Sequence, residues 1–429
     1  MASDSGAPPR PWNRTTAWVL ACGAALSLAL IFTTVDPWLD QVGFLAGGFD
    51  VHVYRDGAWK IYNGHPLYTE TTHRGLSFTY TPFSTLSFLP MLAIPWASVT
   101  NTWLALNICV LYGCVLLCWR VLGYRLTWRL AGLSALLTAT CMFLEPVRTT
   151  LYYGQINLVL MALILWDFSR PPNSRIRGVG VGLAAGIKLV PLYFVAQFVV
   201  LRQWAAAVMA AATFVFTIGL AGAVLPSDSR QYWTRTFFQS NRIAPDTQPA
   251  NQSLRGTIAH FTGGQVPQWL WLLLAAPVAI GGLLLAAELY RRGEKLLTVT
   301  LAGLTSCVVS PFSWNHHWVW FLPLFVYLVH RAVSDPRWWA AAGGVYVATG
   351  AWAYHWTDTW VVVGWFLFPP SWPISPILLN CYIIVYAVIA GCLIASVRRA
   401  RDTHKATDRS ANRPHPLRKS ARTYIRNRP

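Results

Sequence analysis

Charged residues are scarce in this chain of 429 residues: they make up 12% of the sequence, and only 16 of them are Asp or Glu. Hydrophobic residues make up 55%. This balance excludes an ordinary soluble globular protein. Residues 17–35 carry no charge and are long enough to cross about 30 Å of hydrocarbon as a helix. The sequence therefore predicts a protein that crosses a membrane several times.

The usual motifs for nucleotide binding are also missing. The chain has no Walker phosphate loop and no dinucleotide fingerprint on a strand-turn-helix unit, so a cytosolic site for ATP or a nucleotide sugar has no support. The eight cysteines all lie inside apolar runs. We therefore expect neither disulfides nor a metal site, and no cofactor.

The two ends of the chain are basic. Arg10 and Arg14 precede the first apolar run, and no small-residue cleavage site follows it, which indicates a retained anchor after a cytoplasmic N-terminus of residues 1–16. Residues 398–429 hold eleven Lys/Arg and two Asp. We expect a disordered cytoplasmic tail that is attracted to anionic membrane lipids. Nucleic-acid binding is the weaker alternative, because the tail lacks interleaved aromatic residues and a fold.

Basic clusters indicate which loops face the cytoplasm. They lie at residues 120–129, 170–177, 202, 291–295 and 330–337. About ten spans then fit between residues 17 and 397, with both termini cytoplasmic. Residues 82–96 and 178–200 are apolar but contain prolines, so we expect broken helices there, which raises the total to about 12. The outward-facing loops are predicted at residues 36–81, 145–154, 225–265, 311–316 and 357–373.

The first outward loop contains candidate proton acceptors. Asp50 and Asp56 lie among aromatic residues, with His52 and Tyr54 between them. A carboxylate that is partly removed from water has its pKa raised toward the range useful for a general base. The alternative is that the aspartates cap a helix and that His52 is an ordinary loop histidine.

Further polar residues lie at the outer ends of apolar segments. They are Glu145, Arg148, Gln155 and Asn157: Arg148 or its neighbours are candidates for holding an anion, the alternative being a local ion pair between Glu145 and Arg148. Lys188 lies inside an apolar segment, where an ammonium costs about 2.5 to 3.5 kcal/mol. It either binds a phosphate near the interface or extends its amine to the membrane surface.

Two dense polar motifs follow. In NQSLRG, the amides of Asn251 and Gln252 suit sugar hydroxyls and Arg255 suits a phosphate, the alternative being a plain polar loop. SPFSWNHHWVW surrounds His316 and His317 with tryptophans, including Trp314. It suits a sugar ring and a phosphate, or else an interfacial aromatic belt. Zinc is a poor fit, because no other Cys/His cluster accompanies the histidines.

Taken together, these segments resemble a known family. FDVHVY, FTYTPF (which contains Tyr80), YYGQINLVLM, AAGIKLVP, NQSLRG and SPFSWNHHWVW resemble, in this order, the motifs of the family 87 glycosyltransferases of mycobacteria and their relatives. The resemblance implies an all-α GT-C fold with about 10–12 transmembrane helices and a large first periplasmic loop. It also implies an inverting α-1,2-mannosyltransferase of the plasma membrane, which uses a polyprenyl-phosphate-mannose donor on the periplasmic side.

The resemblance also implies roles for particular residues. Asp50 matches the essential aspartate of the family, Asp56 lies outside the pattern, and His316 and His317 match its histidine motif. No metal is required if Lys188, Arg255 and the two histidines supply the positive charge at the phosphate.

The implied acceptor is a mannosyl glycolipid, either a phosphatidylinositol mannoside or lipomannan and lipoarabinomannan. The sequence departs from the family pattern at Thr81 and Leu254. A transporter is the alternative, since broken helices with a lysine also suit a transport site. The absence of an internal repeat and the clustering of polar residues on one side favour an enzyme.

Overall fold

The computed structural model of the chain describes residues 13–33, 47–239, 242–352 and 373–411. Within these ranges the chain is helical and forms no β-strand. It divides into two compact units, Met1–Tyr386 and Ala387–Pro429, and all of the predicted site residues belong to the first. The expected loop at 357–373 lies outside the described residues except for its last residue, as do residues 36–46 of the first loop.

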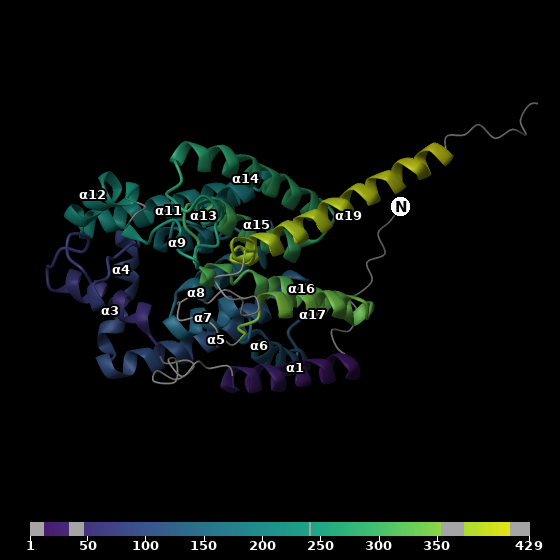
Figure 1. Ribbon diagram of the computed structural model, residues 1–429, viewed down its shortest axis with the longest axis horizontal. Helices are drawn as coiled ribbons and strands as arrows, with labels where there is room; N and C mark the ends of the chain where they lie inside the picture. The colour runs from purple at the N-terminus through teal and green to yellow at the C-terminus, as the bar shows by residue number, and fades with distance from the viewer. Residues whose placement is uncertain (1–12, 34–46, 240–241, 353–372, 412–429) are drawn as a thin grey trace, which may run out of the picture. The chain divides into compact units, whose positions relative to one another are not determined.

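The helices follow one another along the chain with connections of very different length (Figure 1). They are α1 (Arg14–Thr33), α3 (Phe49–Tyr62), α4 (Pro82–Phe88), α5 (Val99–Val121), α6 (Trp128–Cys141), α7 (Glu145–Tyr153), α8 (Asn157–Phe168), α9 (Val179–Ile187), α10 (Leu192–Val200), α11 (Trp204–Val224), α12 (Pro226–Thr234), α13 (Leu254–Thr262), α14 (Gln268–Arg291), α15 (Lys295–Val309), α16 (Phe321–Ser334), α17 (Trp338–Thr349), α18 (Ser375–Leu378) and α19 (Cys381–Ala411).

Five of the described helices are long and apolar enough to cross a membrane: α1, α5, α11, α14 and α19. The pair α7 and α8 would make a sixth span, although it bends by 119°. Helices α6, α15, α16 and α17 occur at other expected spans but have only 12 to 15 residues, fewer than the about 20 that one crossing needs. The chain is therefore an all-α polytopic membrane protein, and the count of ten to twelve spans stays a prediction.

Helix α19 extends further than the sequence predicts. Disorder is expected from residue 398, but residues 398–411 continue this helix. Lys, Arg and Ala in this stretch are good helix formers, so a basic composition alone does not break the helix. The rest of the tail, residues 412–429, lies outside the described residues.

Both expected helix breaks are confirmed. Residues 82–98 form α4 and two short 3₁₀ helices, Leu89–Ala93 and Trp96–Ser98, instead of one continuous helix. Between α9 and α10 the backbone of Lys188 is extended, and Pro191 caps the second helix. Proline cannot continue a helix because it lacks the N–H group and its ring clashes with the preceding turn.

Two segments that are expected to be loops are helical. Residues 49–62 form α3, which buries Val51, Tyr54 and Ala58, spaced as one face of a helix. Residues 145–153 form α7. Helix α4 packs against both α3 and α12, although α12 is far from it in sequence (Figure 1). The first and second large outward loops therefore meet, and the backbone N–H of Leu67 donates to Asp228 Oδ1 at 3.0 Å.

Candidate active site

A cavity of about 500 Å³ lies where the broken helices and the two outward loops converge. Of the residues singled out from the sequence, it brings together Asp50, Tyr80, Gln155, Lys188, Trp314, His316 and His317. Its remaining walls include apolar side chains such as Val190, Trp271 and Val309. The cavity therefore combines one carboxylate and one ammonium with apolar surface.

Asp50 lies in the first turn of α3, half-buried at the cavity wall. Gly48 is the N-cap of this helix; its φ of 55° suits glycine, and a Cβ there would lie 2.2 Å from Thr100 Oγ1. Removal from water raises the pKa of Asp50 to about 6, although a hydrogen bond from Gln155 and the charge of Lys188 act in the opposite direction. Such a carboxylate is ionised at neutral pH and basic enough to accept a proton.

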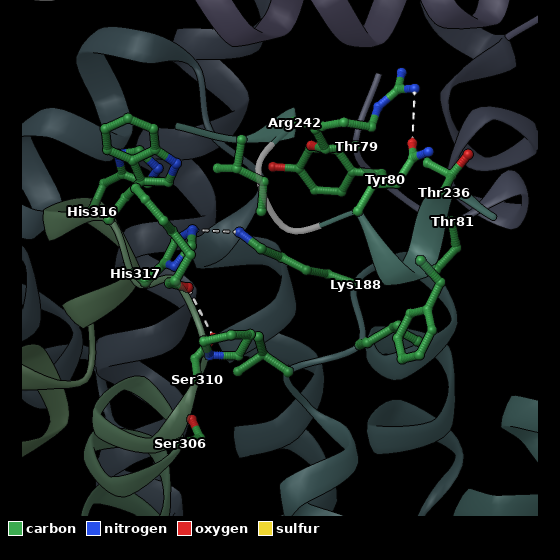
Figure 2. A pocket seen from close by; sticks show the side chains of 18 of the residues that line it. Thr79, Tyr80, Thr81, Lys188, Thr236, Arg242, Ser306, Ser310, His316 and His317 are labelled. Carbon is green, nitrogen blue, oxygen red and sulfur yellow. Dashed lines mark hydrogen bonds between the residues drawn. The ribbon is translucent and has the colours of Figure 1, made fainter. Parts of the chain in front are cut away.

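Lys188 extends from the break between α9 and α10 into the cavity. Its Nζ donates to His317 Nε2 at 2.7 Å and to Asn157 Oδ1 at 3.1 Å, as Figure 2 shows for the histidine. In the part of the chain that the structure describes, no carboxylate lies within 4.0 Å of this ammonium. Its two neutral partners leave the positive charge available to an anion in the cavity.

His316 and His317 lie in a 3₁₀ turn, Asn315–Trp318, between α15 and α16. The backbone carbonyl of His316 accepts from Asn157 Nδ2 at 2.9 Å and from Thr150 Oγ1 at 3.2 Å, which ties the turn to the α7–α8 pair. Burial and the charge of Lys188 hold the pKa of both imidazoles well below their usual value. The histidines are therefore neutral at pH 7, whereas the sequence analysis expects them to contribute positive charge.

The neutral state fixes how each histidine can interact. Because Lys188 donates to His317 Nε2, the proton of that ring is on Nδ1. Both ring nitrogens of His316 are buried without a hydrogen-bond partner in the described structure. The ring stacks on Trp314, with centroids 6.0 Å apart and an interplanar angle of 16°. His316 thus has one donor and one acceptor that no described protein group satisfies.

The NQSLRG motif lies behind the cavity, not on its wall. The backbone N–H of Gln252 donates to the carbonyl of Ser313 at 2.7 Å, and the Asn251 side chain accepts from the N–H of Ser313 at 3.2 Å. Arg255 Nε pairs with Asp246 Oδ2 at 2.9 Å. The structure does not bring these three predicted ligand residues to the cavity. Asn251 and Gln252 instead support the segment that carries the histidines.

The remaining predicted residues do not line the cavity. His52 packs on Trp96, with ring centroids 4.3 Å apart, away from the cavity wall. Tyr54 is fully buried, and its hydroxyl contacts two cavity residues, Tyr80 and Gln155. Glu145 accepts from Thr149 and Asn315, each at 2.6 Å, and from Tyr382. Arg148 is buried in the same helix, α7, and Asn157 holds Lys188 from the start of α8.

Arg242 is a cavity residue that the sequence analysis does not identify. It lies on the far wall from His316 and His317 (Figure 2). Its Nη2 donates to the Tyr68 carbonyl at 2.8 Å, while its Nε is buried without a partner in the described structure. The sequence does not single it out, because the predicted outward loop at residues 225–265 holds four arginines. Hydroxyl groups of Thr79, Thr81, Thr236, Ser306 and Ser310 also line the cavity.

Comparison with known proteins supplies the family. Residues 78–311 match the model of Glycosyltransferase family 87. A protein of Mycolicibacterium smegmatis named polyprenol-phosphate-mannose-dependent alpha-(1-2)-phosphatidylinositol pentamannoside mannosyltransferase is 34% identical over 70% of this chain and 74% of its own length. Its namesake in Mycobacterium tuberculosis is 33% identical over 74% of this chain and 73% of its own.

A second kind of relative differs in its acceptor. A protein of Mycolicibacterium smegmatis named polyprenol-phosphate-mannose-dependent alpha-(1-2)-phosphatidylinositol mannoside mannosyltransferase is 34% identical over 65% of this chain and 68% of its own length. No solved structure matches the chain.

Proposed function

This chain belongs to glycosyltransferase family 87, and we propose that it transfers mannose from polyprenyl-phosphate mannose to a mannosylated glycolipid in α-1,2 linkage. One observation carries the proposal: Asp50 and Lys188, a carboxylate and an ammonium without a carboxylate partner among the described residues, line the same cavity. The reaction needs both groups, since one proton must leave the acceptor and one phosphate must depart from the donor.

Asp50 acts as the general base. The acceptor hydroxyl oxygen forms a bond to C1 of mannose while its proton moves to the Asp50 carboxylate. The bond between C1 and the phosphate oxygen breaks at the same time, and the polyprenyl phosphate leaves with its electron pair. Attack from the side opposite the phosphate inverts the configuration at C1.

Lys188 stabilises the departing phosphate. Its ammonium is held by Asn157 and His317, so little reorganisation is needed as negative charge develops on the phosphate. The imidazole N–H groups of His316 and His317 are further donors for the phosphate or for mannose hydroxyls. Because a monophosphate leaving group carries less charge than a diphosphate, one ammonium and these neutral donors are sufficient, and no metal is needed.

The apolar walls of the cavity suit substrates that are themselves lipids. Leu189, Val190 and Val309 come from the apolar segments on both sides of the polar groups. A water-soluble sugar nucleotide would leave these side chains without a matching partner, whereas an isoprenoid chain buries them. We propose that the cavity lies on the periplasmic side of the plasma membrane, because residues of the predicted outward loops line it, whereas the basic clusters predict the cytoplasmic loops.

The test is reconstitution of the purified protein with polyprenyl-phosphate mannose. Each acceptor class, a short phosphatidylinositol mannoside, a tetra- or pentamannoside and lipomannan, is supplied in turn, and the product is digested with an α-1,2-specific mannosidase. We expect transfer to at least one acceptor and loss of the new mannose on digestion. Asp50→Asn should abolish transfer, while Asp56→Asn should retain it; the reverse result would exclude Asp50 as the base.

A further inference from the structure

Gln155 occupies a backbone position that is fixed on both sides. It follows Gly154, where α7 and α8 meet at 119°. The φ of Gly154 is 70°, and a Cβ there would lie 2.9 Å from the side chain of Val51. The N–H of Gln155 donates to the Thr150 carbonyl at 2.9 Å, and its carbonyl accepts from Asn107 Nδ2 at 3.3 Å. The side chain is 4% exposed and reaches the cavity.

Two tyrosine hydroxyls bind the amide oxygen of Gln155. Oε1 accepts from Tyr54 at 2.9 Å and from Tyr80 at 3.1 Å, and the two hydroxyls lie 2.8 Å apart. The hydroxyls carry two hydrogens for three contacts, and only one hydrogen fits between them. The second hydrogen is then available to Oε1, which both hydroxyls contact.

The two tyrosine contacts to Oε1 also determine where the NH₂ group of Gln155 points. With Oε1 held by the tyrosines, the NH₂ group is the end of the Gln155 amide left for Asp50, which lines the same cavity, and the interaction with Gln155 lowers the pKa of this carboxyl. The reversed amide would place its oxygen against the carboxylate and would suit only a protonated Asp50. The tyrosines thus select the orientation that favours the ionised carboxylate.

We propose that Tyr54 and Tyr80 are positioning residues, which hold the Gln155 amide so that its NH₂ group donates to Asp50 and keeps this carboxylate ready to accept a proton. The inference rests on the proposed function, in which Asp50 is the base. The other polar groups that face Asp50 are Lys188 and the hydroxyls of Tyr54, Tyr80 and Tyr153. Lys188 is the charged one among them at pH 7. Among the neutral groups, the Gln155 amide is the one whose orientation changes the pKa of Asp50.

The experiment compares the pH dependence of single-turnover mannosyl transfer for several variants. Wild-type activity should reach half of its plateau near pH 6, the value to which burial raises the pKa of Asp50. We call the low-pH side of this rate profile, where the rate rises with pH, the acid limb. In Tyr54→Phe/Tyr80→Phe the acid limb should move to higher pH by about one unit, which corresponds to about fivefold slower transfer at pH 6 and about twofold slower transfer at pH 7. Above pH 8 the rates should converge.

Two further variants separate this role from a general loss of packing. Gln155→Met should show the same shift of the acid limb, and adding the two tyrosine changes to it should shift the limb no further, because they act through the same amide. Tyr124→Phe is the matched control: it removes a buried hydroxyl that bonds His330 Nδ1 at 2.9 Å, outside the cavity. Its pH profile should equal that of the wild type.

The single variant Tyr54→Phe keeps the test interpretable if the double variant misfolds, since Tyr54 does not line the cavity and loses only its hydroxyl. It should fold, as monitored by thermal unfolding in detergent, and shift the limb by less than the double variant does. An unchanged acid limb in the double variant and in Gln155→Met would overturn the positioning role. Full activity of Asp50→Asn would instead overturn the proposed base, whatever the tyrosine variants show.

Discussion

Replacing Lys188 with methionine removes the ammonium from the cavity while keeping an unbranched side chain of similar length. If the donor phosphate contacts Nζ, the variant loses one charge-assisted hydrogen bond, which contributes about 1.5 to 3 kcal/mol. At about 1.4 kcal/mol for each factor of ten, this predicts an approximately 10- to 150-fold loss of transition-state stabilisation. The single-turnover rate should fall more than donor affinity does, because the phosphate charge grows as the C1–O bond breaks.

The same substitution also has a structural cost that must be measured separately. It leaves Asn157 Oδ1 and His317 Nε2 without their donor, at about 1 to 3 kcal/mol for each buried acceptor. Lys60→Met is a matched control, since Lys60 is also buried and donates to Glu70 at 3.0 Å but does not line the cavity. It should lower the thermal midpoint without changing donor binding or turnover.

The assay uses radiolabelled polyprenyl-phosphate mannose with detergent-purified protein. Donor affinity is measured by equilibrium binding, and the transfer rate is measured in a single turnover with saturating acceptor. Lys188→Arg keeps the charge and should retain more activity than Lys188→Met, though less than the wild type, because the planar guanidinium cannot reproduce the contact to His317. Wild-type values of both affinity and rate in folded Lys188→Met would refute a role for this lysine at the phosphate.

Three further predictions concern residues around the cavity. Arg255→Ala should lower the thermal midpoint, since breaking a buried ion pair and leaving Asp246 uncompensated costs about 3 to 5 kcal/mol. The folded fraction should bind donor normally; weaker binding would indicate that Arg255 contacts the donor phosphate. Arg242→Ala should slow single turnover, because the guanidinium links the second outward loop to the first. An unchanged rate would show that Arg242 lines the cavity without contributing to transfer. A cysteine at exposed Thr71 should react with a membrane-impermeant thiol reagent in intact cells, and one at exposed Asn173 should not; the opposite labelling would invert the topology.

The sequence predicts the helix breaks well because their causes are local. Proline ends a helix wherever the chain goes next, and a lysine in an apolar run marks a place where the backbone leaves regular structure. The segment around Lys188 shows both signals within four residues, and the structure breaks the helix there. Asp50, Gln155 and the two histidines are predicted in or directly beside outward-facing loops, and the structure brings them to one cavity.

What the sequence cannot predict depends on contacts between distant segments. Arg255 suits a phosphate by its chemistry, but the turn between Asp246 and Arg255 brings a carboxylate to it. Arg242 carries no motif, and only the meeting of the two outward loops brings it to the cavity wall. The charge of the histidines is likewise unreadable from the sequence, because the neutral state of His316 and His317 follows from burial beside Lys188.

The neutral histidines explain how a membrane cavity can hold its one ammonium. A second positive charge next to Lys188 would add repulsion in a region of low dielectric constant, where such interactions are strong. Neutral imidazole instead accepts from Nζ through Nε2 and keeps a donor on Nδ1, so it both holds the lysine and adds hydrogen-bonding capacity. Asn157 supports the lysine with its side-chain oxygen and the histidine turn with its side-chain nitrogen. One amide at the start of α8 thus connects the cation to the histidine turn, and the geometry at the phosphate depends on the same helix pair that positions Gln155 beside Asp50.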